Sequence, residues 1–77
     1  MPDRISSIVA RLPEFEFELH RRCSHDPDFR AVCADYEEAA AARRHWETVP
    51  GGELRAAEYL HFLAELESEI RSHLGPV

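Results

Sequence analysis

A four-residue break in the second half of the chain, Val49-Pro50-Gly51-Gly52, constrains the fold more than any other feature of the sequence. Proline stops an α-helix, and glycine tolerates the positive φ angles that a tight reversal needs. On both sides of the break, apolar residues recur every three or four positions, as on one face of an α-helix. The sequence therefore predicts two helices, over residues 27–48 and 53–74, that fold back on each other antiparallel.

Local signals mark where these two helices start and stop. Asp26 is a favourable N-cap and Pro27 a favourable first helical residue, whereas Gly75-Pro76 ends the second helix. The apolar stripe of the first helix consists of Phe29, Val32, Cys33, Tyr36, Ala39, Ala40 and Trp46, and that of the second consists of Ala56, Tyr59, Leu63, Leu66, Ile70 and Leu74.

Pairing the two stripes about the break matches residues by size. Trp46 faces Ala56 and Ala39 faces Leu63, so that a large residue meets a small one near the turn. Farther out, residues of similar size meet, as where Val32 faces Ile70. This complementarity favours the hairpin, because a close-packed interface needs matched volumes.

The first 24 residues are predicted to form a kinked helical arm. A short helix should end near Leu12, because the residue before a proline disfavours the α-helical region. Pro13 then suits the first turn of a new helix. Phe15, Phe17 and Leu19 alternate with glutamates, which also fits a strand, but no turn and partner strand follow. We therefore expect one all-α domain over residues 1–77, an antiparallel two-helix hairpin with a kinked N-terminal arm.

Charge and hydropathy narrow the classes of partner. The chain has 15 acidic and nine basic residues, a formal net charge of −6. Such a surface repels phosphates, so we expect no binding to nucleic acid or to anionic membranes. No segment approaches the roughly 20 apolar residues of a membrane span, and the N-terminus lacks an apolar signal region. The cytoplasm is the expected location, with both cysteines reduced.

Some residues of the sequence could bind a metal, namely His20, Cys23 and Cys33. His20 and Cys23 can share a helix face, and thiolates and imidazoles are ligands of zinc. The alternative is that both cysteines are small buried apolar residues, and the spacing matches no established metal site. We therefore expect no metal and no cofactor. We also expect no enzymatic activity, because the sequence contains no nucleophile motif and no glycine-rich phosphate loop.

The order of several residues resembles the YdcH-like family, small uncharacterised bacterial proteins regarded as helical hairpins or coiled coils. The resemblance is carried by Leu12-Pro13-Glu14-Phe15, Leu19-His20, Asp26, Phe29, Tyr36 and Glu47, and more loosely by Leu63, Leu66, Glu69, Ile70 and Leu74. It implies a helical hairpin and no particular activity. The chain departs from the family in the apolar segment of residues 59–63 and in Phe17, and both departures favour a partner.

Apolar residues outside the pairing scheme indicate a function in association. Phe15, Phe17, Leu60 and Phe62 are the predicted partner-binding residues, because exposed apolar patches mark association sites. The alternative is that the N-terminal helix covers residues 59–63 within one chain. We expect a protein–protein interaction module, a homo-oligomer or an accessory subunit of a larger assembly. The alternative function is a metal- or redox-responsive regulator that uses Cys23, Cys33 and His20.

Overall fold

Helices account for most of the chain. The computed structural model describes residues 5–75 and contains α1 (Ser6–Arg11), α2 (Glu16–His25), α3 (Pro27–Thr48) and α4 (Glu53–Leu74), with a 3-10 helix, η1 (Pro13–Phe15), before α2. No strand occurs within these described residues. The predicted all-α class is therefore confirmed, and the strand interpretation of residues 15–19 is wrong. The two long helices have the bounds that the sequence predicts.

The start of α3 is fixed by a side-chain cap. One carboxylate oxygen of Asp26 accepts hydrogen bonds from the backbone N–H groups of Asp28 and Phe29, at 3.0 and 3.2 Å. These groups have no acceptor within the helix, so the cap replaces the hydrogen bonds that they would lose. Pro27 occupies the first turn, where it forfeits no hydrogen bond.

The reversal between α3 and α4 is a β-turn over residues 49–52. The Gly52 N–H donates to the Val49 carbonyl oxygen at 2.9 Å. Pro50 and Gly51 occupy the central positions, and Gly51 has φ +79°, the pattern of a type II turn. Gly52 has φ −88°, a conformation that does not require glycine. Gly52 is needed for space instead, because a Cβ there would lie 2.4 Å from the Trp46 carbonyl oxygen.

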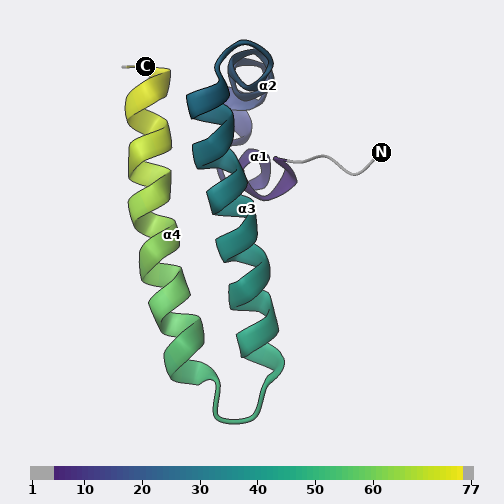
Figure 1. Cartoon of the computed structure of the whole chain (residues 1–77), viewed down its shortest axis with the longest axis vertical. Helices are drawn as coiled ribbons and strands as arrows, with labels where there is room; N and C mark the ends of the chain where they lie inside the picture. Colours follow the sequence, from purple (N-terminus) through teal and green to yellow (C-terminus); the bar gives the residue numbers. More distant parts are fainter. Residues whose placement is uncertain (1–4, 76–77) are drawn as a thin grey trace.

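The two long helices lie side by side along most of their length and run in opposite directions (Figure 1). Their facing sides carry the apolar stripes that the sequence indicates. Buried on α3 and α4 are Phe29, Cys33, Tyr36, Ala39, Ala40, Ala56, Leu63, Leu66 and Ile70, whereas Val32, Tyr59 and Leu74 are partly buried. Burying this apolar surface is the main favourable contribution to folding.

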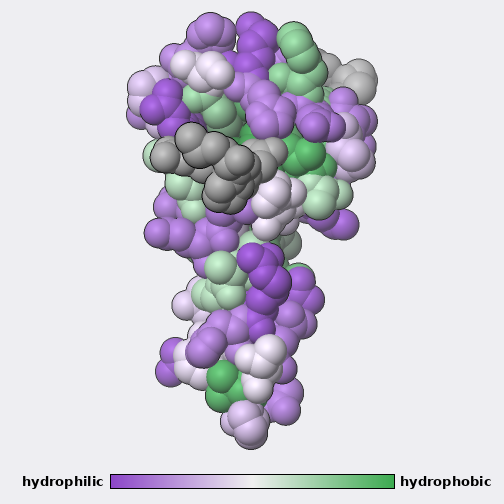
Figure 2. Space-filling model, turned by 90° about the vertical axis from the view of Figure 1, so that its right-hand side faces the viewer, coloured by the Kyte–Doolittle hydropathy of each residue, from purple (hydrophilic) through white to green (hydrophobic). Residues whose placement is uncertain are grey.

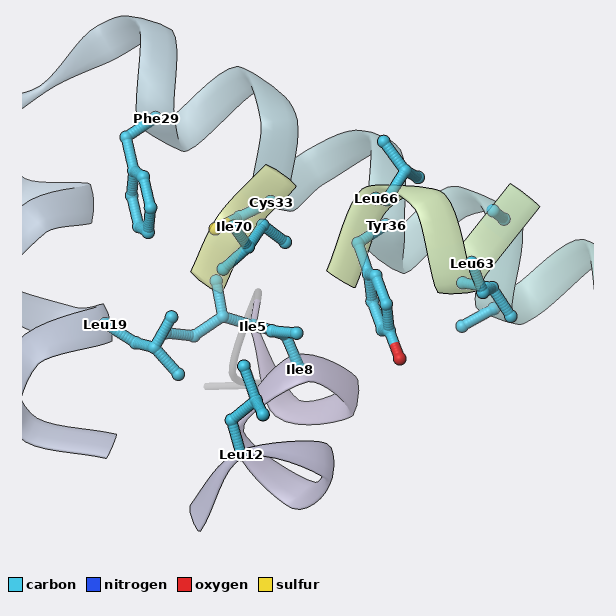
Figure 3. Close-up of a cluster of buried hydrophobic side chains, with 12 residues drawn as sticks. Ile5, Ile8, Leu12, Leu19, Phe29, Cys33, Tyr36, Leu63, Leu66 and Ile70 are labelled. Atoms are coloured by element: carbon cyan, nitrogen blue, oxygen red, sulfur yellow. The ribbon is translucent and has the colours of Figure 1, made fainter. Parts of the chain in front are cut away.

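The arm, defined here as α1, η1 and α2, packs against one side of the hairpin near its open end (Figure 1). Ile8, Leu12 and Leu19 of the arm are fully buried. Figure 3 shows them with Ile5 pointing toward Cys33 and Ile70 of the long helices. Of the predicted arm, residues 1–4 lie outside the described part of the chain.

The surface on the N-terminal side of the molecule is mainly polar. Figure 2 shows a broad end, where the arm covers the hairpin, and a narrow end at the turn. Hydrophobic residues appear on this side as separate spots between hydrophilic ones. Within residues 5–75, no helix is long and apolar enough to cross a membrane.

Candidate protein-interaction surface

A shallow groove runs between α3 and α4 on the side of the hairpin that the arm leaves uncovered. It is lined by Asp35, Glu38, Ala39, Ala42, Tyr59 and Phe62, and we call it the arm-free groove. The two alanines form its base, and their small side chains leave space between α3 and α4. Tyr59 and Phe62 form its aromatic wall, and Phe62 is 43% exposed. Aromatic side chains of this kind dominate the binding energy of many protein interfaces.

The arm is held on the opposite side by Glu37. Both carboxylate oxygens of Glu37 accept hydrogen bonds from α1, one from the backbone N–H of Ser7 at 3.1 Å and one from that of Ile8 at 3.0 Å. Because α1 has no side-chain cap of its own, Glu37 satisfies two of its free N–H groups from the neighbouring helix. A negative charge also interacts favourably with the positive end of the helix dipole.

A salt bridge joins the end of α1 to α4. The Arg11 guanidinium donates to the Glu67 carboxylate at 2.5 Å, and the same carboxylate lies 3.6 Å from Arg71. Glu67 raises the pKa of Arg11, first through this hydrogen bond and then through its charge. Together with Glu37, this contact fixes which side of the hairpin the arm covers. The predicted covering of residues 59–63 by the arm is therefore only partial, since Leu60 and Phe62 stay exposed.

Leu60 belongs to a different surface from Phe62. It is 51% exposed and lines a groove on the arm-bearing side, beside Arg11, Tyr36, Arg43 and Glu67. The two residues are separated along α4 by a single position, so they project from different faces of the helix. Leu60 and Phe62 therefore do not form one binding patch.

The two predicted phenylalanines of the arm also differ from each other. Phe17 is 78% exposed and lies with Pro13, Glu14 and His20 on the outside of the arm. Phe15 is half-buried and packs against the hydrophobic core. Phe15 therefore offers less surface to a partner than Phe17 does, because part of its side chain packs against the core, and its role in partner binding stays a prediction. Of the four predicted residues, Phe62 is the one that lines the arm-free groove.

Several acidic residues of the molecule differ in whether they have a salt bridge or hydrogen-bond partner. On the arm and the arm-bearing side, Glu18 pairs with Arg21 and Arg22, whereas Glu37 and Glu67 bind the arm. Four carboxylates around the arm-free groove have no salt bridge to any residue between 5 and 75, namely Asp35, Glu38, Glu58 and Glu69.

Position along α4 places two of these carboxylates beside the groove. Glu58 and Glu69 lie four residues before and seven residues after Phe62, and therefore on its face of the helix. Arg55, seven residues before Phe62, has its guanidinium 5.2 Å from the centre of the Trp46 ring, a cation–π contact. The net result is an aromatic wall flanked by four carboxylates without salt bridges and by one arginine on the same face of α4, so that negative charge predominates.

The two cysteines lie close together in the core rather than at a reactive surface. Cys33 is fully buried and Cys23 is half-buried against the same cluster, and no disulfide joins them. Burial, with a smaller contribution from Cys23, raises the pKa of Cys33 to about 12. A thiol with such a pKa carries almost no thiolate at neutral pH, and the thiolate is the reactive form.

Potential metal ligands and catalytic groups are dispersed. Among residues 5–75, no three His, Cys, Asp or Glu side chains come together as a metal site, and His20, Cys23 and Cys33 are no exception. All five histidines are exposed. His73 lies edge-on to the Phe29 ring, 5.8 Å between centroids, and His61 lies 3.1 Å from Glu65 on the same helix.

Two features of this surface escape the sequence patterns. Leu54 is 73% exposed near the turn and falls outside the apolar stripe, so helical periodicity gives no reason to single it out. Glu37 reads as one more charged residue of a long helix, and only the fold reveals its bonds to α1. The sequence signal that could have indicated a cap from elsewhere is the apolar Ile5 before α1, where a polar cap residue would normally stand.

Comparisons with known proteins found no match to this chain. No family model matches the chain, and neither a curated protein nor a solved structure matches it. The expected kinship with the YdcH-like family therefore stays a prediction.

Proposed function

We propose that the chain is a non-enzymatic protein–protein interaction module, acting as a small homo-oligomer or as an accessory subunit of a larger assembly. Its working form is an antiparallel two-helix hairpin with a kinked N-terminal arm, in the cytoplasm. The observation that carries the proposal is Phe62, which stays 43% exposed beside Tyr59 in a groove that no residue of the arm lines. A third helix packed there would complete a three-helix layer of the kind that the arm makes on the other side.

Burial of Phe62 would supply a useful part of the binding energy. Fully burying a phenylalanine is worth about 1.5–3 kcal/mol relative to its exposed state, and part of that remains available here. Leu60 and Phe17 add exposed apolar surface, but each lies on another side of the chain. The non-enzymatic character is supported by the histidines, which lie exposed rather than together in one pocket with an orienting partner.

The test compares the wild-type chain with the double variant Leu60→Ser, Phe62→Ser. Both side chains are exposed, so circular dichroism should show unchanged helicity. Association is measured by sedimentation of the pure chain over a range of concentrations, and by the size of the complexes that contain the tagged chain in extracts of its own cells. We expect the wild type to associate in at least one setting and the variant in neither. Leu54→Ser is the control, because it removes a leucine that is more exposed than Leu60 and lines neither of the two grooves beside Leu60 and Phe62.

A wild-type chain that is monomeric in both settings would show that the proposal is wrong. If the wild type and the double variant associate equally, the chain is still an interaction module, but its binding site does not include Leu60 and Phe62.

A further inference from the structure

The residues that line the arm-free groove suit the binding of one α-helix. Ala39 and Ala42 lie three residues apart on α3 and leave a low floor between the two long helices. Small residues allow a third helix to approach closely, with its ridge of side chains in the groove. Tyr59 and Phe62 then contact the apolar face of that helix from one side. An amphipathic helix in a groove is an established mode of peptide recognition.

The charge around the groove selects the kind of helix. Asp35 and Glu38 line it, and Glu58 and Glu69 share the α4 face of Phe62. Within the described residues these carboxylates have no salt bridge, whereas Glu37 and Glu67 on the other side are occupied in holding the arm. Complementary charge speeds association and excludes wrong partners. The occupant should therefore carry Arg or Lys beside its apolar stripe.

A second copy of this chain fits the groove poorly. Each copy has a formal net charge of −6, and a groove placed against a groove brings the same unpaired carboxylates together. Like charges opposed across an interface are unfavourable and act against that pairing. From the groove and its charge we infer that the arm-free groove binds a basic amphipathic helix of another protein. This inference rests on the proposed interaction function and specifies its partner.

The probe for this inference is a displayed library of amphipathic helical peptides of about 18 residues, or five turns. Their apolar stripe is fixed as leucine, and the flanking positions vary among Arg, Lys, Gln, Ser, Asp and Glu. Peptides are selected on the wild-type chain after removal of those that bind the Phe62→Ser variant. We expect Arg and Lys to be enriched over Asp and Glu at the flanks by about tenfold or more, since each factor of ten corresponds to about 1.4 kcal/mol.

Binding constants of a selected peptide then locate the site. Phe62→Ser should weaken binding about tenfold, as expected for a central aromatic contact. The double variant Asp35→Asn, Glu38→Gln should weaken binding less and should flatten its dependence on salt, because two of the attracting charges are gone. Leu54→Ser and Glu16→Gln, which remove an exposed leucine and an exposed acid outside the groove, should change neither quantity.

Each other outcome overturns the inference. If the selected peptides carry neutral or acidic residues beside their apolar stripe, the inference of a basic partner is wrong. If no peptide is selected on the wild-type chain, the groove does not bind an amphipathic helix. If no peptide is selected while the wild type self-associates through Phe62, the interaction function stands and the basic partner is wrong. If the chain also fails to associate in the sedimentation and extract experiments, both proposals are wrong.

Discussion

Glu37 of α3 caps a helix to which it does not belong, by accepting a hydrogen bond from the backbone N–H of Ile8 in α1 at 3.0 Å. A helix of six residues has no stability of its own in water, so α1 exists because the hairpin holds it. This contact, together with the buried Ile8 side chain, is what places the arm on one side of the hairpin and leaves the other side free.

Replacing Glu37 by alanine should loosen the arm and spare the hairpin. The variant loses two hydrogen bonds from a charged acceptor, and we expect a cost of about 1.5 kcal/mol in the free energy of unfolding. Urea denaturation measures the cost, and amide hydrogen exchange should show faster exchange in α1 with α4 unchanged. Glu38→Ala is the control, because Glu38 is adjacent in sequence and its carboxylate forms no hydrogen bond or salt bridge with the described residues. Equal effects of the two substitutions would contradict the assigned role of Glu37.

The two glycines of the turn should respond differently to alanine. Gly51→Ala places a side chain at φ +79° with open space around it, so only the backbone conformation costs energy, about 1 kcal/mol. Gly52→Ala brings a Cβ within 2.4 Å of the Trp46 carbonyl oxygen, and relieving this clash should cost about 2–3 kcal/mol. The midpoints of urea unfolding of the two variants show which substitution destabilises the chain more. A smaller loss for Gly52→Ala than for Gly51→Ala would show that the turn relaxes without strain.

The cap of α3 should depend on the shape of the Asp26 side chain rather than on its charge. Asp26→Ala removes the acceptor of the Asp28 and Phe29 N–H groups and should cost about 1 kcal/mol. Asp26→Asn keeps an oxygen in place and should cost little, because asparagine caps helices about as well as aspartate. Thermal unfolding of both variants at neutral pH distinguishes them. A large loss in the asparagine variant would instead assign the effect to the helix dipole.

Stability should fall as the pH rises above about 8.5, the pKa of an unfolded cysteine. The pKa of Cys33 is raised to about 12 in the folded chain by burial, whereas an unfolded cysteine titrates near 8.5. Between these values the unfolded state loses a proton that the folded state keeps, so rising pH favours unfolding. Between pH 8 and 10 we expect a loss of about 1–2 kcal/mol in the free energy of unfolding. In Cys33→Ala this dependence should diminish, although the substitution also lowers stability at every pH.

Thiol labelling at neutral pH tests the alternative function as a redox-responsive regulator. Cys33 should react only when the chain opens, and therefore far more slowly than in urea. Cys23, which is half-buried, should react faster than Cys33. Rapid labelling of both thiols in the native chain, slowed by added zinc, would favour the regulator over the interaction module. Mass spectrometry of the labelled peptides identifies which cysteine has reacted.

The sequence was most informative where one local signal decides the structure. Asp26-Pro27 starts α3 and Pro50-Gly51 ends it, because caps and turns depend on a few adjacent residues. The apolar stripes predict the buried residues of both long helices, because apolar residues spaced three or four positions apart lie on one face of a helix and that face is buried. The all-α class follows from these signals together.

Contacts between distant segments were less accessible to sequence reasoning. The bonds of Glu37 to α1 and of Arg11 to Glu67 join residues about 30 and 56 positions apart, and no periodicity links them. These contacts decide which face of the hairpin stays open. Sequence reasoning therefore found Phe62 and Leu60 as surplus apolar residues, but it grouped them, although they lie on different faces of α4.

The arm has a further effect on how motion is distributed along the molecule. Helices fray at their termini, and here the turn ties one pair of termini covalently, whereas Leu19 of α2 packs into the core with Phe29 and Ile70 near the other pair. The arm also reaches mid-length, because Glu37, which binds α1, lies near the midpoint of α3. The two long helices are therefore restrained at both ends and, at mid-length, from the arm-bearing side alone, so the face that carries Phe62 keeps the most freedom to adjust to a bound helix.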